Sequence, residues 1–257
     1  MFDFHMALAI TGVALVGGLI GLDRTAAGQF MISQPIVAAP LVGWLLGDAT
    51  AGLIIGAMLE LIWVLDMPVG SFVPADATIS AVTATAIAAL TCPGGAPRSV
   101  LGFCVLLSAG TVPFTMMAET YVRSWNSRLV DAAHAVAGAD VARSLSRAHL
   151  AGLGAFFLKS VVLYVLLLPA GLAVTALFMR SPSTVQIAME LFLKLLPLLG
   201  VALVVRRLSI SSLDPFVLTG FITAGLATPA LHLHAALVTL LTVVSGWLGV
   251  RYREYRS

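Results

Sequence analysis

The sequence predicts an all-α, polytopic membrane protein built from transmembrane helices together with broken or re-entrant helices. The first observation is composition: 60% of the 257 residues are hydrophobic and 10% are charged, whereas a soluble domain carries about 25% charged residues. The second is a series of apolar windows cut by Gly and Pro, and the third is a set of acidic side chains among those windows. We therefore expect a single integral membrane domain over residues 1–257.

Four apolar windows reach the roughly 20 residues that a spanning helix needs. They are residues 99–118, 151–178, 185–205 and 231–250. A further apolar window, residues 6–22, opens the chain. The window 6–22 has no Lys or Arg before it, so we expect an uncleaved span there rather than a secretory signal peptide.

Four further apolar windows are short, and prolines interrupt or border several of them. They are residues 35–47, 51–65, 78–91 and 213–228. Unwound backbone at membrane depth is tolerated only where protein or a water-filled cavity satisfies its polar groups. Short, broken hydrophobic segments therefore mark binding sites in transporters. We predict broken or re-entrant helices between about residues 35 and 91, beside such a site.

The sizeable polar region is residues 119–150. Its apolar residues recur at roughly helical spacing, which predicts an amphipathic helix on the membrane surface or against a partner. An ordinary polar loop is the alternative. Arginines cluster in this region and again in the tail after residue 250, and the positive-inside rule places both segments in the cytoplasm.

Acidic residues concentrate in the first third of the chain. Five of the 12 acidic residues lie between positions 23 and 76: Asp23, Asp48, Glu60, Asp66 and Asp76. A carboxylate is costly to bury in hydrocarbon, so it usually faces the interior of the bundle and usually serves a function. The segment from Asp23 to Thr78 is thus expected to line a polar site, although Asp66 could simply mark a membrane boundary.

Glu60 is the first candidate for binding a substrate. Gly52, Gly56 and Glu60 are spaced by four residues, so they share one face of a helix on which the glycines permit close backbone approach. A carboxylate accepts hydrogen bonds from hydroxyl groups, which is what sugar recognition requires. The alternative is a structural carboxylate paired with Arg24 or with a backbone donor.

Asp76 and Gln29 are the other two candidates. Asp76 follows a Pro- and Gly-rich stretch, and it could bind a ligand, act as the N-cap of a helix beginning at Ala77, or do both. Gln29 offers a donor and an acceptor for hydroxyl groups, and its alternative role is to cap its loop. Asp48 is expected to be an N-cap rather than a ligand.

Other classes of function find no support in the sequence. The histidines do not form a metal-ligand pattern, and no nucleophile elbow, phosphate-binding loop or dinucleotide-binding glycine motif is present. No dense basic run indicates a nucleic-acid partner. Cys92 and Cys104 are expected to be small packing residues. We therefore expect no catalytic residue, no metal and no cofactor on this chain.

An ordered series of motifs resembles the mannose/fructose/sorbose-type phosphotransferase system IIC membrane subunit. The motifs are residues 34–43, 46–48, 52–61, 68–70 and 74–76. The resemblance implies an oligomeric sugar permease in the bacterial inner membrane that assembles with a IID membrane subunit and receives phosphoryl groups through IIA and IIB proteins. It also implies that the phosphate-donating histidine lies on IIB, that the substrate is a hexose or amino sugar, and that Gln29, Glu60 and Asp76 bind it.

Two other readings stay open at this point. The chain could be an ion-coupled secondary transporter, in which Glu60 and Asp76 would bind protons or sodium. It could also be a regulatory membrane subunit that does not transport.

Overall fold

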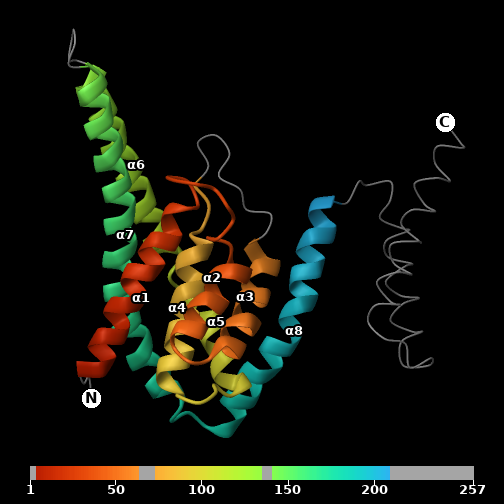
Figure 1. Cartoon of the computed structure of the whole chain (residues 1–257). Helices are drawn as coiled ribbons and strands as arrows, with labels where there is room; N and C mark the ends of the chain where they lie inside the picture. The colour runs from red at the N-terminus through yellow and green to blue at the C-terminus, as the bar shows by residue number, and fades with distance from the viewer. Residues whose placement is uncertain (1–3, 64–72, 135–140, 209–257) are drawn as a thin grey trace, which may run out of the picture. The chain divides into compact units, whose positions relative to one another are not determined.

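The computed structural model describes residues 4–63, 73–134 and 141–208. All regular secondary structure in these ranges is helical (Figure 1). The helices are α1 (Phe4–Leu22), α2 (Pro35–Leu45), α3 (Ala49–Trp63), α4 (Ala77–Thr91), α5 (Arg98–Ala109), α6 (Val112–His134), α7 (Val141–Phe178) and α8 (Ser183–Leu208). Residues 1–201 form one compact unit and residues 202–257 a second.

The predicted mixture of long and short helices is confirmed in the described residues. Within residues 4–63, 73–134 and 141–208, three helices are long and apolar enough to cross a membrane: α1, α7 and the Ser183–Gly200 part of α8. A fourth span is formed if α5 and α6, which meet at a 40° bend, are counted together. In contrast, α2, α3 and α4 contain 11, 15 and 15 residues, fewer than a straight span needs. The windows 213–228 and 231–250, the arginine-rich tail and Asp66 lie outside the described residues.

Helix α4 is the centre of the first unit. Every residue from Thr78 to Ala89 is buried, and α4 contacts α1, α2, α3, α5 and α7. A helix that is covered on all sides belongs in the core of a large or membrane-embedded bundle. Most α4 side chains are Ala, Ser, Thr or Val, and such small residues allow the surrounding helices to approach closely.

Helices α2 and α3 form a tight hairpin whose close packing depends on glycine. A Cβ atom on Gly52 would overlap the carbonyl oxygen of Ala39, and a Cβ atom on Gly56 would lie 2.5 Å from the carbonyl oxygen of Pro35. The turn between the two helices contains Gly47 at φ 83°, in the left-handed region that glycine adopts readily. The glycine face predicted from the spacing is therefore where α3 contacts the backbone of α2.

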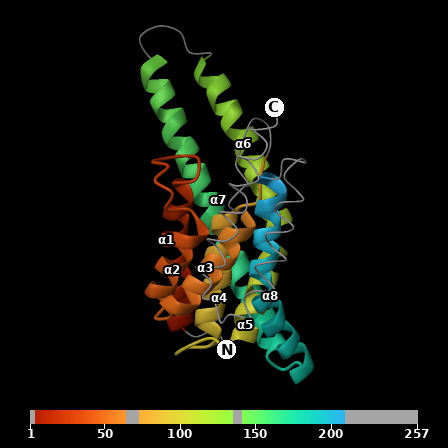
Figure 2. The ribbon, with the colours of Figure 1, turned by 90° about the vertical axis from the view of Figure 1, so that its right-hand side faces the viewer.

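Helices α6 and α7 also form a hairpin, and it divides the polar region 119–150. The two helices lie side by side in both views and extend beyond the adjoining end of α1 (Figures 1 and 2). Helical structure was expected in this region, but it belongs to two helices that both continue into apolar segments. The reason is that apolar segments flank the polar region: α5 and the start of α6 precede it, and the remainder of α7 follows it. The cytoplasmic position of residues 119–150 stays a prediction.

The glycine contact in the α2–α3 hairpin generates a stability prediction. Gly52→Val places a branched side chain against the Ala39 carbonyl, and overpacking of this kind typically costs about 1–3 kcal/mol. We expect the free energy of unfolding in detergent to fall by about that amount. Gly12→Val is the matched control, because nothing lies within 4 Å of a Cβ atom at Gly12. Equal stability of the two variants would show that α3 does not pack on α2 in this way.

Candidate functional site

Asp76 lies at the start of α4 between two cations. Arg24 Nη1 is 3.0 Å from Asp76 Oδ1, and Lys159 Nζ is 3.0 Å from Asp76 Oδ2. The backbone N–H of Ile79 also donates to Oδ1 at 3.2 Å. The expectation that Asp76 caps a helix beginning at Ala77 is thus confirmed, and its buried carboxylate is held from three directions.

The same charge network continues onto α6 and α7. Lys159 Nζ, on α7, lies 2.8 Å from Oε2 of Glu119, and Nε of Arg123 lies 2.9 Å from Oε1 of the same carboxylate. The network is thus a chain of alternating charges: Arg24, Asp76, Lys159, Glu119 and Arg123. Three cations face two carboxylates, so the network as a whole carries a net charge of +1.

The loop of residues 23–34 connects α1 to α2 and is folded around Asp23. The buried Asp23 carboxylate accepts hydrogen bonds from the backbone N–H groups of Phe30 at 2.6 Å and Ser33 at 3.1 Å. Burial opposes ionisation of Asp23, but these hydrogen bonds outweigh it and hold the pKa of Asp23 below its usual value. The hydroxyl of Thr78 donates to the Ser33 carbonyl at 2.7 Å, which ties the end of the loop to α4.

Gln29 is exposed in this loop and has φ 58°. It borders a cavity of about 380 Å³ together with the two arginines that end the charge network. The cavity is lined by Arg24, Thr25, Gln29, Arg123, Asn126 and Phe156. Since Arg24 also pairs with Asp76, this arginine connects two of the three predicted binding residues.

Glu60 lies in the last turn of α3, next to the start of α2. Its Oε2 accepts a hydrogen bond from the backbone N–H of Ile36 at 3.2 Å. One oxygen of the Glu60 carboxylate is therefore paired with a backbone donor, as one of the alternatives for this residue predicted. Arg24, the other partner considered for Glu60, instead pairs with Asp76. Glu60 is partly exposed.

Asp48 serves as the N-cap that its position predicts. Its Oδ1 accepts from the N–H of Ala51 at 2.9 Å, at the start of α3. Its Oδ2 accepts from the N–H of Ala96 at 3.2 Å, so the same carboxylate also fixes the segment before α5.

The three predicted binding residues thus lie in or near the loop 23–34. Gln29 is part of this loop. Asp76 lies two residues before Thr78, whose hydroxyl binds the end of the loop, and Glu60 accepts a hydrogen bond from the start of α2, the helix that follows the loop. Within the described ranges, no group of three His, Cys, Asp or Glu side chains could hold a metal ion.

Sequence reasoning missed Lys159 and Glu119. Lys159 carried a usable signal, because it is the sole charged residue in the apolar window 151–178, and an ionisable side chain in such a window is a candidate functional residue. Glu119 lies at the edge of the polar region 119–150, where an acidic residue is unremarkable. Its role depends on contact with a helix 40 positions away in sequence.

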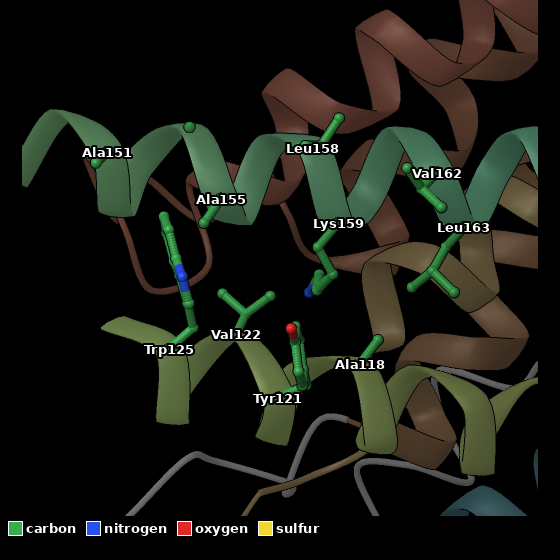
Figure 3. A pocket seen from close by; sticks show the side chains of 11 residues that line it. Ala118, Tyr121, Val122, Trp125, Ala151, Ala155, Leu158, Lys159, Val162 and Leu163 are labelled. Atoms are coloured by element: carbon green, nitrogen blue, oxygen red, sulfur yellow. The ribbon is translucent and has the colours of Figure 1, made fainter. Parts of the chain in front are cut away.

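A second cavity, of about 520 Å³, lies between α6 and α7. Figure 3 shows the side chains of Trp125, Val122 and Tyr121 pointing from α6 toward α7, and the side chain of Lys159 pointing from α7 toward α6. Its lining is mostly apolar, in contrast to the polar cavity beside Gln29.

Comparison with known proteins identifies a family for nearly the whole chain. Residues 7–244 match the family described as the PTS system sorbose-specific IIC component. The fructose permease IIC component of Bacillus subtilis is 28% identical over 227 residues, covering 84% of this chain and 75% of the relative. The mannose-specific EIIC component of Escherichia coli K12 is 24% identical over 252 residues, covering 96% and 91%.

Solved structures share the fold. One described as a membrane protein matches with a TM-score of 0.71 and 21% identity, covering 99% of this chain and 97% of that chain. A chain from the complex of the mannose transporter ManYZ with microcin E492 matches with a TM-score of 0.57 and 22% identity, covering 96% and 95%. The apolar helices and the family match together make this a multi-pass membrane protein. The chain belongs to the PTS sorbose-specific IIC component family, the membrane permease subunits through which phosphotransferase systems translocate sugars.

Proposed function

We propose that this chain carries a hexose-type sugar across the bacterial inner membrane and that Gln29, Glu60 and Asp76 form its binding site. In this proposal a IID membrane subunit completes the permease, IIA and IIB proteins supply the phosphoryl group, and the assembly is oligomeric. The fructose and mannose permease relatives and the similarity in fold to a chain of the ManYZ complex support a sugar substrate and a multisubunit permease.

One observation carries the assignment of the site: the ends of three short helices lie around the end of the loop 23–34, where α2 begins. The start of α2 follows the loop directly, the start of α4 is tied to it through Thr78, and the last turn of α3 reaches α2 through Glu60. Helix N-termini concentrate backbone N–H donors, and carboxylates beside them supply acceptors. Sugar hydroxyls need both kinds of partner.

The individual carboxylates differ in how much capacity they have left for a sugar. Asp76 already accepts from Arg24, Lys159 and Ile79. Glu60 uses one recorded hydrogen bond, from Ile36, and a carboxylate has about four acceptor positions. We therefore assign direct hydroxyl binding chiefly to Glu60 and Gln29, with Asp76 positioned at the edge of the site beside Arg24.

The proposed function is tested by uptake and phosphorylation assays. Membranes containing this chain with IID, IIB and IIA subunits are supplied with radiolabelled mannose, fructose and N-acetylgalactosamine in the presence of phosphoenolpyruvate. We expect one of these sugars to accumulate in phosphorylated form, and to do so only when all subunits are present. Uptake of neutral sugar that follows an ion gradient and needs no phosphoenolpyruvate would overturn the proposal.

Glu60→Gln is expected to weaken sugar binding by about ten-fold or more. A hydrogen bond to a charged group contributes about 1.5–3 kcal/mol, and each 1.4 kcal/mol is about one decade in affinity. The variant keeps the shape of the side chain, and a neutral amide is cheaper to bury than a carboxylate, so insertion and assembly should survive. Glu190→Gln, on the exposed surface of α8, is the control. Normal sugar affinity in Glu60→Gln, or failure of that variant to assemble, would make Glu60 a structural acid.

The α6–α7 hairpin provides a test of topology. Ser127 is exposed on α6, so Ser127→Cys should be accessible to a membrane-impermeant thiol reagent on whichever side the hairpin lies. In a background carrying Cys92→Ala and Cys104→Ala, we expect labelling only after the cells are permeabilised. Labelling of intact cells would place residues 119–150 outside and reverse the predicted orientation.

Lys159 is expected to hold the site together rather than to contact sugar. Its side chain is 6% exposed and bridges Asp76 and Glu119, and removal of one partner from a buried charge pair typically costs about 3–5 kcal/mol. Lys159→Met should therefore lower the free energy of unfolding by about that amount. The control is Lys194→Met, because Lys194 forms an exposed pair with Glu190, which should be worth less than about 1 kcal/mol. Equal small losses would show that the network does not stabilise the bundle.

A further inference from the structure

We propose that the cavity beside Gln29 binds the phosphoryl group of a phosphorylated sugar. The cavity lies between the loop 23–34, α6 and α7, and its lining includes Arg24, Arg123 and Asn126. The proposal rests on the function proposed above, because a phosphotransferase permease delivers its substrate as a sugar phosphate. It adds a second, anionic subsite to the site of neutral sugar binding.

The first support is that both ends of the charge network line the same cavity. Arg24 begins the network on the loop after α1 and Arg123 ends it on α6, and both arginines border this one space. Asp76, Lys159 and Glu119 each pair with two groups of opposite charge. Within the network, Arg24 and Arg123 each pair with one carboxylate. The network therefore leaves its unbalanced positive charge at the two residues that face the cavity.

The second support is the number of hydrogen-bond donors that remain. Arg24 uses Nη1 for Asp76 and Nη2 for the Ala75 carbonyl, and Arg123 uses Nε for Glu119. A guanidinium group has five N–H donors arranged in a fork that fits phosphate oxygens two at a time. The Arg24 and Arg123 side chains are 19% and 35% exposed, so a ligand can reach both.

Asn126 supplies the third support. Its side-chain oxygen is buried without a hydrogen-bond partner among the described residues, although Asn126 borders the cavity. Asn126 also carries an amide nitrogen with two N–H donors, which are of the kind that an anion accepts. Thr25 lines the same space, and its hydroxyl group is a further donor. The Asp23 carboxylate nearby in sequence is occupied by backbone N–H groups of the loop.

The volume and remaining lining favour a sugar phosphate over free phosphate. About 380 Å³ falls within the ~300–1,000 Å³ range of small-molecule sites, which leaves room beyond one phosphate group. Gln29 offers a donor and an acceptor for hydroxyl groups, and Phe156 gives the cavity one aromatic wall. This combination of two arginines, one amide pair and one aromatic ring suits a phosphate attached to a sugar ring.

The test is equilibrium binding to the full chain in lipid nanodiscs, measured by calorimetry. The probes are mannose 6-phosphate, fructose 1-phosphate and N-acetylgalactosamine 6-phosphate, each beside its neutral sugar, with inorganic phosphate as a separate arm. We expect one sugar phosphate to bind at least about ten-fold more tightly than its neutral sugar and than inorganic phosphate. If no sugar phosphate exceeds its neutral sugar, or if inorganic phosphate binds as tightly, the proposal is wrong.

Variants separate a defined site from general attraction by basic residues. Arg123→Gln removes the cavity arginine while Glu119 keeps its pair with Lys159, and we expect it to weaken sugar phosphate binding about ten-fold or more. Arg128→Gln is the matched control, since Arg128 is exposed on the same helix and does not line the cavity. We expect a change of less than about two-fold for this control. Equal weakening by the two variants would overturn the proposal.

A second substitution guards against loss of folding. Arg123→Lys keeps the charge and can keep the pair with Glu119, but it lacks the planar fork that contacts two phosphate oxygens. We expect it to bind sugar phosphate more weakly than the wild type and more tightly than Arg123→Gln, with neutral sugar binding unchanged. These binding measurements do not depend on transport. If the chain supports sugar phosphorylation but binds sugar phosphate no more tightly than neutral sugar, this subsite is rejected and the proposed function stands.

Discussion

The ion pairing of Asp76 with Arg24 and Lys159 is the interaction on which the arrangement of the first unit depends. It joins the loop after α1, the start of α4 and the middle of α7 at one carboxylate, and through Lys159 it extends to Glu119 on α6. Buried charges are tolerated only when they are paired and hydrogen-bonded. Any movement that separates α7 from α4 would therefore have to break or replace this network, which couples the polar hairpin of α6 and α7 to the central helix.

A second constraint explains why acidic residues concentrate among short helices. Every helix begins with N–H groups that have no partner within the helix, and a broken helix inside a membrane protein cannot leave them to lipid. The structure assigns one carboxylate to each such start: Glu60 to α2, Asp48 to α3 and Asp76 to α4. Glu60, Asp48 and Asp76 are thus capping groups first. Those with remaining acceptor positions are also suited to bind hydroxyl groups.

The sequence predicted features that depend on local rules. Asp48 and Asp76 follow from N-cap preference, and the Gly52–Gly56–Glu60 face follows from helical spacing, so these predictions needed no knowledge of neighbouring helices. The charge network could not be predicted in the same way, because Lys159 lies 83 positions from Asp76 and pairing over that distance is decided by packing. Residues 119–150 show the same limit: their periodicity indicated helix, but only the adjoining apolar segments determine that two helices share them.

The charge network and the candidate binding residues are parts of one arrangement. Arg24 is bound to Asp76 on one side and borders the cavity of Gln29 on the other, so the position of this guanidinium depends on the same carboxylate that caps α4. A ligand that draws Arg24 toward the cavity would weaken its hold on Asp76 and shift the balance toward Lys159. Arg24 therefore connects the cavity to the Asp76 carboxylate, which in turn pairs α4 with Lys159 of α7. Such a link lets a binding event at the loop act on the packing of the bundle, since a ligand shifts a conformational equilibrium through its different contacts in the two states.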